Sequence, residues 1–479
     1  MLKYTTDERL KLVDEYIEKN RDAIIRDLMD ISAYPSVKGE KEPGAPFGRD
    51  CKIKLEAVAR LFEERGFKTV IREEGGYALS YYGEGDKALG LFSHADVVPV
   101  DGEWLITEPF KPIVKDGYIF GRGVNDDVSG IVEMLWAVMI IRDLGLPLKS
   151  RILFFNGTNE ETGMEDIAAF VKSEEMPYAS IIPDSGYPVE RGQKSSMKVN
   201  LTSREPLSYI KSFGGGCAVN VVLGYAECAM PYSEEAYAEL LSLTEGAIAY
   251  TVIKNGDSVI LKAEGKQAHA AHPESGINAA LLLAKILKSC SALPEGDRRI
   301  MERVENILSD TAGSSLGIEH SDGVFSPLTA ANGICKLTPD GKVVLSFDIR
   351  ASASFDLEEM AEKIHTATDV EWTIDVVRAS KGFLHSEDDP RMAAIVETYE
   401  RISGETGRKP LLIAGGTYAR ALKNAYSIGT VGYYKAPPIE LPAGHGGVHQ
   451  PDEKISIAGL LEALKILVFM ILELDGVIN

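Results

Sequence analysis

Short apolar segments of strand length alternate with a longer helical segment in the first part of the chain. The apolar runs are residues 88–92 (ALGLF), 151–155 (RILFF) and 179–183 (ASIIP). Between the first two, residues 128–145 have the length and period of a helix and end at a glycine. This alternation is typical of βαβ units and predicts a mixed, mainly parallel sheet with flanking helices over residues 1–190.

The pattern changes at about residue 191 and changes back at about residue 380. Residues 191–220 are polar and rich in glycine, and strand-like alternation follows, whereas the helical style returns in residues 391–405 and 455–474. We therefore predict an α/β catalytic domain formed by residues 1–190 and 381–479, interrupted by an α+β domain over residues 191–380. Segments 220–273 and 342–390 of this insert are weakly similar, which predicts two similar halves, each built as strand, helix, strand.

Composition narrows the classes of partner. The chain has 479 residues, of which 45% are hydrophobic and 26% charged, so a globular protein with more than one domain is expected. A formal net charge of −21 argues against nucleic acid or an anionic membrane as a partner. The five cysteines show no CxxC spacing, and the charged N-terminus does not resemble a signal peptide, so we expect a reduced, cytoplasmic chain. The apolar residues 460–474 are too short to span a bilayer.

Polar residues that can bind metal or move protons follow the three predicted strands. His94 and Asp96 follow the first, Glu160 and Glu161 the second, and Asp184 the third. Ligands bind beyond the carboxyl ends of strands in open α/β sheets, so these side chains are expected at one rim. Acidic groups gathered there repel one another unless protons or cations neutralise them.

Two further segments carry candidate ligands. Asp126 and Asp127 precede the helix at 128–145, and His445 and His449 lie in a glycine-rich loop before the last helix. Each has an ordinary explanation, because an aspartate before a helix is often an N-cap and a glycine-rich loop can carry incidental histidines. Imidazoles and carboxylates without thiols nevertheless match the ligand set of a two-metal hydrolase.

Five ordered motifs resemble a known family. They are SHADVVP (93–99), GRGVNDD (121–127), NEETG (159–163), PDSGYP (183–188) and HQPDE (449–453). Together they resemble the di-metal amidohydrolases that include acetylornithine deacetylase, succinyl-diaminopimelate desuccinylase, glutamate carboxypeptidase and carnosinase. The likeness is strongest to peptidase V and related Xaa-His dipeptidases, and it extends over nearly the whole chain.

The resemblance implies two divalent metal ions per chain, with zinc preferred and manganese or cobalt as alternatives. The implied ligands are His94, Asp126, Glu161, Asp184 and His449. Asp126 would bridge the two ions, and a cis peptide bond would join it to Asp127. Asp96 would accept a proton from the His94 imidazole, and Glu453 would do the same for His449. Glu160 would act as general base on a water held between the ions.

The insert, by the same resemblance, would be a lid that contributes to substrate binding. His269 matches the residue that stabilises the tetrahedral oxyanion, and Arg350 matches the arginine that binds the substrate carboxylate. Further contacts to the C-terminal end of the substrate are implied for Asn220, Gly415, Gly416 and Thr417. The sequence departs from the family at Val128, where a lysine is usual, and after Asn220, where a proline–aspartate pair is missing.

The resemblance therefore implies a monomeric metal-dependent dipeptidase that releases the N-terminal residue of dipeptides or short peptides. Two alternatives stay open. An N-acyl amino-acid deacylase would use the same metals and Arg350, but would offer an apolar pocket where a dipeptidase offers a carboxylate, from Asp127 or Glu160, to the substrate ammonium. A catalytically inactive peptide-binding protein would lack a ligand or the base, and none of these residues is missing.

Overall fold

The computed structural model describes residues 2–216, 218–368, 370–432 and 437–479. The chain forms two compact units. Unit 1 consists of Met1–Arg191, His385–Leu411 and Gly416–Asn479, and unit 2 consists of Gly192–Leu384 and Leu412–Gly415. The domain scheme expected from the sequence did not include the return of residues 412–415 to unit 2. Three short strands lie where the chain passes between the units, namely β8 (Glu190–Gln193), β17 (Phe383–Leu384) and β18 (Leu411–Ile413).

Unit 1 is built on a six-stranded sheet with the order β1-β2-β6-β3-β7-β19. Its strands are β1 (Lys68–Arg72), β2 (Tyr77–Tyr82), β6 (Arg151–Gly157), β3 (Ala88–His94), β7 (Ala179–Ser185) and β19 (Ala425–Gly429). The pairs β6–β3, β3–β7 and β7–β19 are parallel, whereas β1–β2 and β2–β6 are antiparallel. The predicted mixed, mainly parallel sheet is confirmed, and the three apolar runs are β3, β6 and β7.

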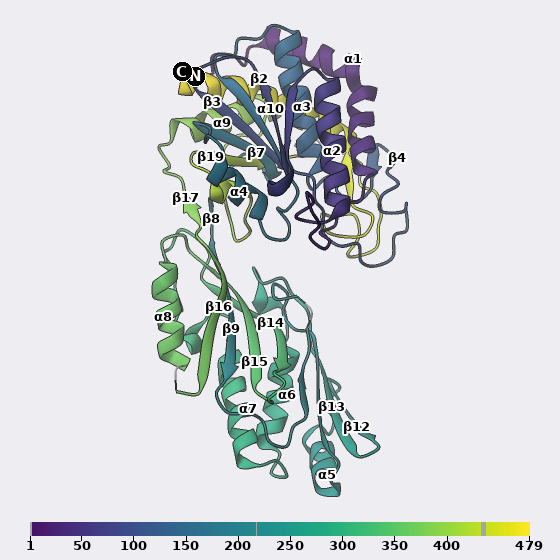
Figure 1. Ribbon diagram of the computed structural model, residues 1–479, viewed down its shortest axis with the longest axis vertical. Helices are drawn as coiled ribbons and strands as arrows, with labels where there is room; N and C mark the ends of the chain where they lie inside the picture. The colour runs from purple at the N-terminus through teal and green to yellow at the C-terminus, as the bar shows by residue number, and fades with distance from the viewer. Residues whose placement is uncertain (1, 217, 369, 433–436) are drawn as a thin grey trace. The chain divides into compact units, whose positions relative to one another are not determined.

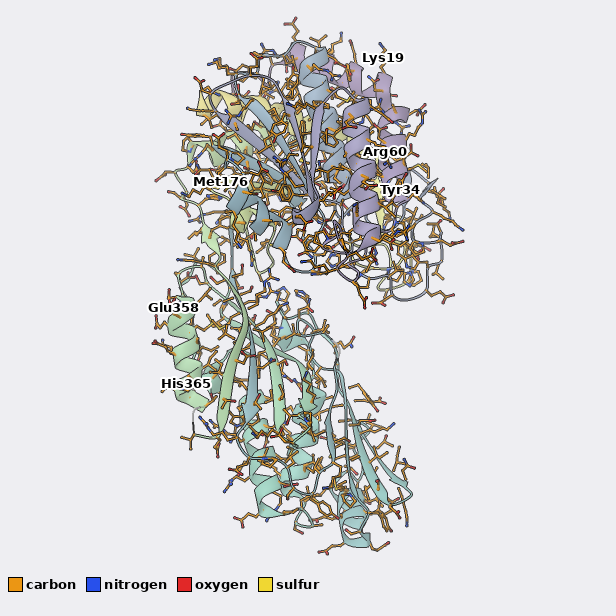
Figure 2. The ribbon with its side chains drawn as sticks, viewed as in Figure 1. Lys19, Tyr34, Arg60, Met176, Glu358 and His365 are labelled. Carbon is orange, nitrogen blue, oxygen red and sulfur yellow. The ribbon has the colours of Figure 1, made fainter. Side chains whose placement is uncertain are left out.

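Helices flank this sheet, as Figure 1 shows. They are α1 (Asp7–Ser32), α2 (Arg49–Glu64), α3 (Val128–Asp143), α4 (Glu165–Ser173), α9 (Pro390–Ser403) and α10 (Ile457–Ile478). The apolar helices α3 and α10 are buried along most of their length, whereas α1 and α2 present Lys19 and Arg60 to solvent (Figure 2). No helix in the described ranges is long and apolar enough to cross a membrane.

A cluster of aromatic side chains packs against the parallel strands β3 and β6. Phe92, Phe155, Phe170 and Tyr418 contact one another with centroid distances of 5.1–5.4 Å. Tyr418 belongs to the short helix η4 (Tyr418–Ala421). A small sheet, β20-β5-β4, completes the unit with β4 (Ile113–Lys115), β5 (Tyr118–Phe120) and β20 (Lys454–Ser456), and one 3-10 turn, η1 (Glu73–Gly75), precedes β2.

Unit 2 contains two four-stranded sheets, β10-β11-β13-β12 and β14-β15-β9-β16. The predicted strand, helix and strand are β11, α5 and β13 in the first sheet and β15, α8 and β16 in the second; β12, which lies between α5 and β13, was not expected. The strands are β9 (Ser195–Ser203), β10 (Ser212–Gly214), β11 (Tyr225–Pro231), β12 (Tyr250–Asn255), β13 (Ser258–Glu264), β14 (Thr329–Leu337), β15 (Val343–Ala351) and β16 (Trp372–Ser380).

The helices of unit 2 pack on these sheets over an extensive apolar core. They are α5 (Glu234–Leu243), α6 (Ala279–Ser289), α7 (Glu295–Leu308) and α8 (Leu357–Thr368), with the 3-10 turns η2 (Pro273–Ser275) and η3 (Ser314–Leu316). In α8, Met360 and Ile364 are buried, while Glu358 and His365 lie on the exposed side (Figure 2). Cys51, Cys228, Cys290 and Cys335 are free and buried, and Cys217 lies outside the described residues.

Candidate metal centre

Asp126 lies between two imidazoles in unit 1. Its Oδ1 is 3.1 Å from His94 Nε2, and its Oδ2 is 3.0 Å from His449 Nε2. His94 is the last residue of β3, Asp126 lies in the turn before α3, and His449 lies in the loop before β20. One carboxylate therefore directs each of its two oxygens toward a different histidine, which is the arrangement that a carboxylate bridging two ions requires.

The remaining predicted ligands surround the same carboxylate. His449 Nε2 is 3.1 Å from Glu161 Oε1, and His94 Nε2 is 3.9 Å from Asp184 Oδ1. The parallel pairing of β3 with β6 sets His94 opposite Gly157, so both strands end at the same rim, where Glu160 and Glu161 follow β6. Two groups of potential ligand atoms lie within 4.8 Å of one another: His94 with Asp126 and Glu161, and His94 with Glu160 and Asp184.

The turn that carries Asp126 is held by Glu453. The Glu453 carboxylate accepts hydrogen bonds from Arg122 Nη1 at 2.8 Å and from the backbone N–H groups of Gly123, Asn125 and Asp126 at 3.1–3.2 Å. Both Glu453 and Arg122 are about 1% exposed. The expectation that Glu453 binds the His449 imidazole is therefore wrong; its carboxylate fixes the bridging aspartate instead.

Asp96 also has a different role from the expected one. His94 Nδ1 lies 3.0 Å from the backbone carbonyl of Asp96 and 3.5 Å from its carboxylate Oδ1, so the main-chain oxygen is the nearer acceptor. The Asp96 carboxylate instead accepts the backbone N–H groups of Glu160 and Glu161 at 3.1 and 3.2 Å. Asp96 thus connects the end of β3 to the segment that carries the proposed base.

A third buried carboxylate, Asp166, supports the same segment. It accepts the N–H groups of Thr158 and Asn159, both at 2.8 Å, and the hydroxyl of Tyr418 at 2.5 Å. Sequence reasoning missed Asp166 because it lies in the first turn of α4, where an acidic residue is ordinary. Nothing in the sequence marks its contact with Tyr418, which lies 252 residues away.

The peptide bond between Asp126 and Asp127 is cis, as the resemblance implied. The Asp127 side chain turns into the protein, where it is 1% exposed and its Oδ2 accepts the Ser93 hydroxyl at 2.5 Å. Of the two carboxylates considered for the substrate ammonium, Glu160 is therefore the one that belongs to the ligand cluster.

Burial and mutual proximity shift the pKa values of these groups. Burial, with Asp127 and Asp126 nearby, raises the pKa of Asp184 well above its usual value, and burial, with Glu161 nearby, does the same for Glu160. Hydrogen bonds to Asp126 and Glu161 raise the pKa of His449 to about 10. The cluster therefore retains protons in the absence of another source of positive charge.

The residues fit a pair of divalent cations. A tetrahedral ion with bonds near 2.05 Å places its ligand atoms roughly 3.3 Å apart, close to the 3.0–3.9 Å measured around Asp126. In addition, Glu160 Oε1 is buried without a hydrogen-bond partner among the described residues. His94, Asp126 and Asp184 would hold one ion, and Asp126, Glu161 and His449 the other.

A cavity of about 560 Å³ adjoins this cluster within unit 1. Asp126 and Asp184 form part of its wall, together with Tyr187, Tyr399 and Val431. The cavity is large enough for an amino-acid side chain and is lined by both aromatic and polar groups.

The predicted substrate residues of unit 2 are linked by a chain of contacts. The backbone carbonyl of Asn220 accepts the Ala270 N–H at 2.9 Å, and Val221 pairs with His269 in an isolated bridge. Thr329, which is the cross-strand partner of Arg350, donates to the Ala270 carbonyl at 3.0 Å. Arg350 Nη1 donates to the carbonyl of Ala414, beside Gly415, at 3.0 Å.

Gly416 and Thr417 belong to unit 1. Thr417 is 4% exposed, and its hydroxyl bonds to Ser427 at 2.8 Å and caps η4. The Thr417 side chain therefore fixes the loop after Gly416.

A mixed sheet whose parallel strands bring one imidazole and several carboxylates to Asp126, with a second imidazole from the loop before β20, defines a metal-dependent hydrolase. Residues 90–473 match the sequence profile of Peptidase family M20/M25/M40. The chain belongs to this family and is a metallopeptidase, as the five motifs predicted.

A curated relative matches over nearly the whole chain, and solved structures share its fold. The chain is 30% identical over 476 residues to a Bacillus subtilis (strain 168) protein named "Putative dipeptidase YtjP", covering 96% of this chain and 98% of that one. Its fold is similar to that of human carnosine dipeptidase 1, with a TM-score of 0.55, 16% identity and coverage of 98% and 100% of the two chains. Aminoacylhistidine dipeptidase from Vibrio alginolyticus gives a TM-score of 0.52, 15% identity and coverage of 94% of this chain and 96% of that one.

Proposed function

We propose that this protein is a metal-dependent dipeptidase that hydrolyses the amide bond of dipeptides or short peptides and releases the N-terminal residue. The observation that carries the proposal is the position of Asp126, with one carboxylate oxygen at 3.1 Å from His94 and the other at 3.0 Å from His449. The 30% identity to a protein named as a dipeptidase supports the substrate class.

Two divalent ions, when bound, supply Lewis acidity and lower the pKa of water toward 7. Glu160 takes a proton from the attacking water and passes it to the departing amine. Its backbone N–H, which donates to the buried Asp96 carboxylate, fixes the start of the side chain. The cavity beside Asp126 and Asp184 receives the N-terminal side chain of the substrate.

Unit 2 contributes the residues for the other end of the substrate. His269 donates to the carbonyl oxygen as negative charge develops there, and Arg350 binds the terminal carboxylate with its planar guanidinium. Asn220 and the loop of Gly415, Gly416 and Thr417 contribute further contacts. We also propose zinc as the metal, a monomeric state and a cytoplasmic location.

A dipeptide library assayed on metal-reconstituted protein tests the proposal. Turnover of Ala-Ala without turnover of N-acetyl-alanine is expected, and the reverse result would assign a deacylase instead. Glu160→Ala is the control, because a contaminating peptidase would leave its activity unchanged. Absence of turnover on both substrate classes, with metal bound, would favour a peptide-binding protein.

A further inference from the structure

The sheet β14-β15-β9-β16 has one apolar and one polar face. Met197, Val199 and Leu201 of β9, with Leu345, Phe347 and Ile349 of β15, belong to the core of unit 2. Side chains alternate between the faces of a strand, so the intervening residues share the opposite face. In register order these are Ser196 opposite Arg350, Lys198 opposite Asp348 and Asn200 opposite Ser346.

Arg350 is fixed and electrically compensated on this face. Its Nε and Nη2 donate to the two oxygens of Asp348 at 2.5 and 2.9 Å, and its Nη1 donates to the Ala414 carbonyl at 3.0 Å. Asp348 is fully buried, and both of its oxygens are used by Arg350. The pair therefore carries no net charge, although it presents the guanidinium in one orientation.

The positive charge of Lys198 is not balanced by an ion pair of the kind that Arg350 forms with Asp348. It stands opposite Asp348 on one side and next to Arg378 of β16 on the other. It is half-buried, and its ammonium forms no hydrogen bond or ion pair with any residue in the described part of the chain. Burial lowers the pKa of Lys198; Asp348 opposes this shift, while Arg378 and Arg350 add to it. An anion that approached this face would compensate the charge of the Lys198 ammonium.

Lys198 is also within reach of a ligand held by Arg350. The two residues are diagonal neighbours on adjacent antiparallel strands, and such positions lie about 7–8 Å apart, a span that long side chains bridge. A carboxylate bonded to the guanidinium, or a second carboxylate one side chain away, can therefore meet the Lys198 ammonium.

We infer that Lys198 is a second carboxylate-binding residue beside Arg350, and that it favours peptides with an acidic C-terminal residue where the carboxylate it contacts is that of the side chain. Arg350 supplies the fixed geometry and Lys198 supplies the uncompensated positive charge. This inference rests on the proposed dipeptidase function. The carboxylate it contacts is either the terminal carboxylate or the acidic side chain of that residue, and the two sources give different results in the same experiment.

The experiment compares Ala-Glu with the isosteric, neutral Ala-Gln as substrates of wild type and Lys198→Met. We expect KM to rise about tenfold in the variant at a similar kcat. A rise confined to Ala-Glu assigns the side-chain carboxylate, and an equal rise on both substrates assigns the terminal carboxylate. Any other pattern, including unchanged KM on both, overturns the inference. Lys198→Arg should restore most of the loss, because it keeps the charge.

Two controls separate this role from a structural one. Lys336→Met removes an exposed lysine from β14 of the same sheet and should leave KM unchanged. Metal content and the unfolding temperature of Lys198→Met should equal those of wild type. If either value falls, the Lys198→Gln variant is used in place of Lys198→Met.

Failure of the proposed dipeptidase function can be distinguished from failure of the inference about Lys198. If wild type cleaves no dipeptide, calorimetric titration of the metal-loaded full chain with L-glutamate tests Lys198 directly. Binding that Lys198→Met weakens about tenfold upholds the inference, while unchanged or absent binding overturns it.

Discussion

Replacing Glu453 by glutamine should remove hydrogen bonds that hold the turn carrying Asp126. Each carboxylate oxygen accepts two hydrogen bonds, one oxygen from Arg122 and Gly123 and the other from Asn125 and Asp126. Glutamine keeps one oxygen and replaces the other with an N–H₂ group, so two bonds are lost and donors face donors. The substitution also leaves the Arg122 guanidinium, 1% exposed, without its counter-charge.

The cost follows from the burial of this pair. Breaking a buried ion pair by removing one partner destabilises a protein by about 3–5 kcal/mol. In a unit of this size the unfolding temperature should fall by about 5–8 °C. Loss of a group that supports a metal ligand also weakens metal binding by roughly 10–100-fold, because Asp126 is no longer held between the two histidines.

Thermal unfolding of metal-free protein and calorimetric metal titration measure the two effects separately. Glu64→Gln is the matched control, because Glu64 ends α2 on the exposed surface of the same unit and forms no interaction in the described structure. If Glu453→Gln unfolds and binds metal as Glu64→Gln does, the role assigned to Glu453 is wrong.

Three further predictions concern the site. Glu160→Ala should retain both metal ions, measured by mass spectrometry, while kcat falls by at least about 100-fold; retained turnover removes Glu160 from the role of base. Arg350→Lys should raise KM about tenfold with little change in kcat, since lysine cannot make the bidentate contact; an unchanged KM would move carboxylate binding elsewhere. The pKa of His449 in the metal-free fold is about 10, against an ordinary value of 6.5. Its proton therefore stabilises that fold fully below pH 6.5, and this stabilisation is lost as pH rises toward 10. Metal must displace this proton, so affinity should increase as pH rises toward about 10, with net proton release measured by calorimetry in buffers of different ionisation enthalpy; pH-independent affinity would contradict this.

The rim of the sheet could be predicted because its cause is local. Apolar runs of strand length identify β3, β6 and β7, and parallel strands necessarily end on the same side, so His94, Glu161 and Asp184 were expected to meet. The sequence alone could not place His449, which reaches Asp126 from 323 positions further along the chain (449 − 126). Its assignment depended on the resemblance.

The supporting carboxylates were harder to predict because their partners are backbone N–H groups. Asp96 and Glu453 each bind two or more amides of a distant segment, and Asp166 binds two amides of the preceding loop. Backbone amides carry no sequence signal. The charge balance around Lys198 is hidden for a similar reason. It depends on the pairing register of β9 with β15. A slip of one residue would move the side chains of a strand to the other face of the sheet.

The central claim is that two cations share Asp126. Crystals of the metal-loaded protein, with diffraction recorded above and below the zinc absorption edge, test it most directly. Two anomalous peaks are expected, one on each side of the Asp126 carboxylate, one beside His94 and the other beside His449, and both should be lost in Asp126→Ala. A single peak, or two peaks that do not contact Asp126, would contradict it.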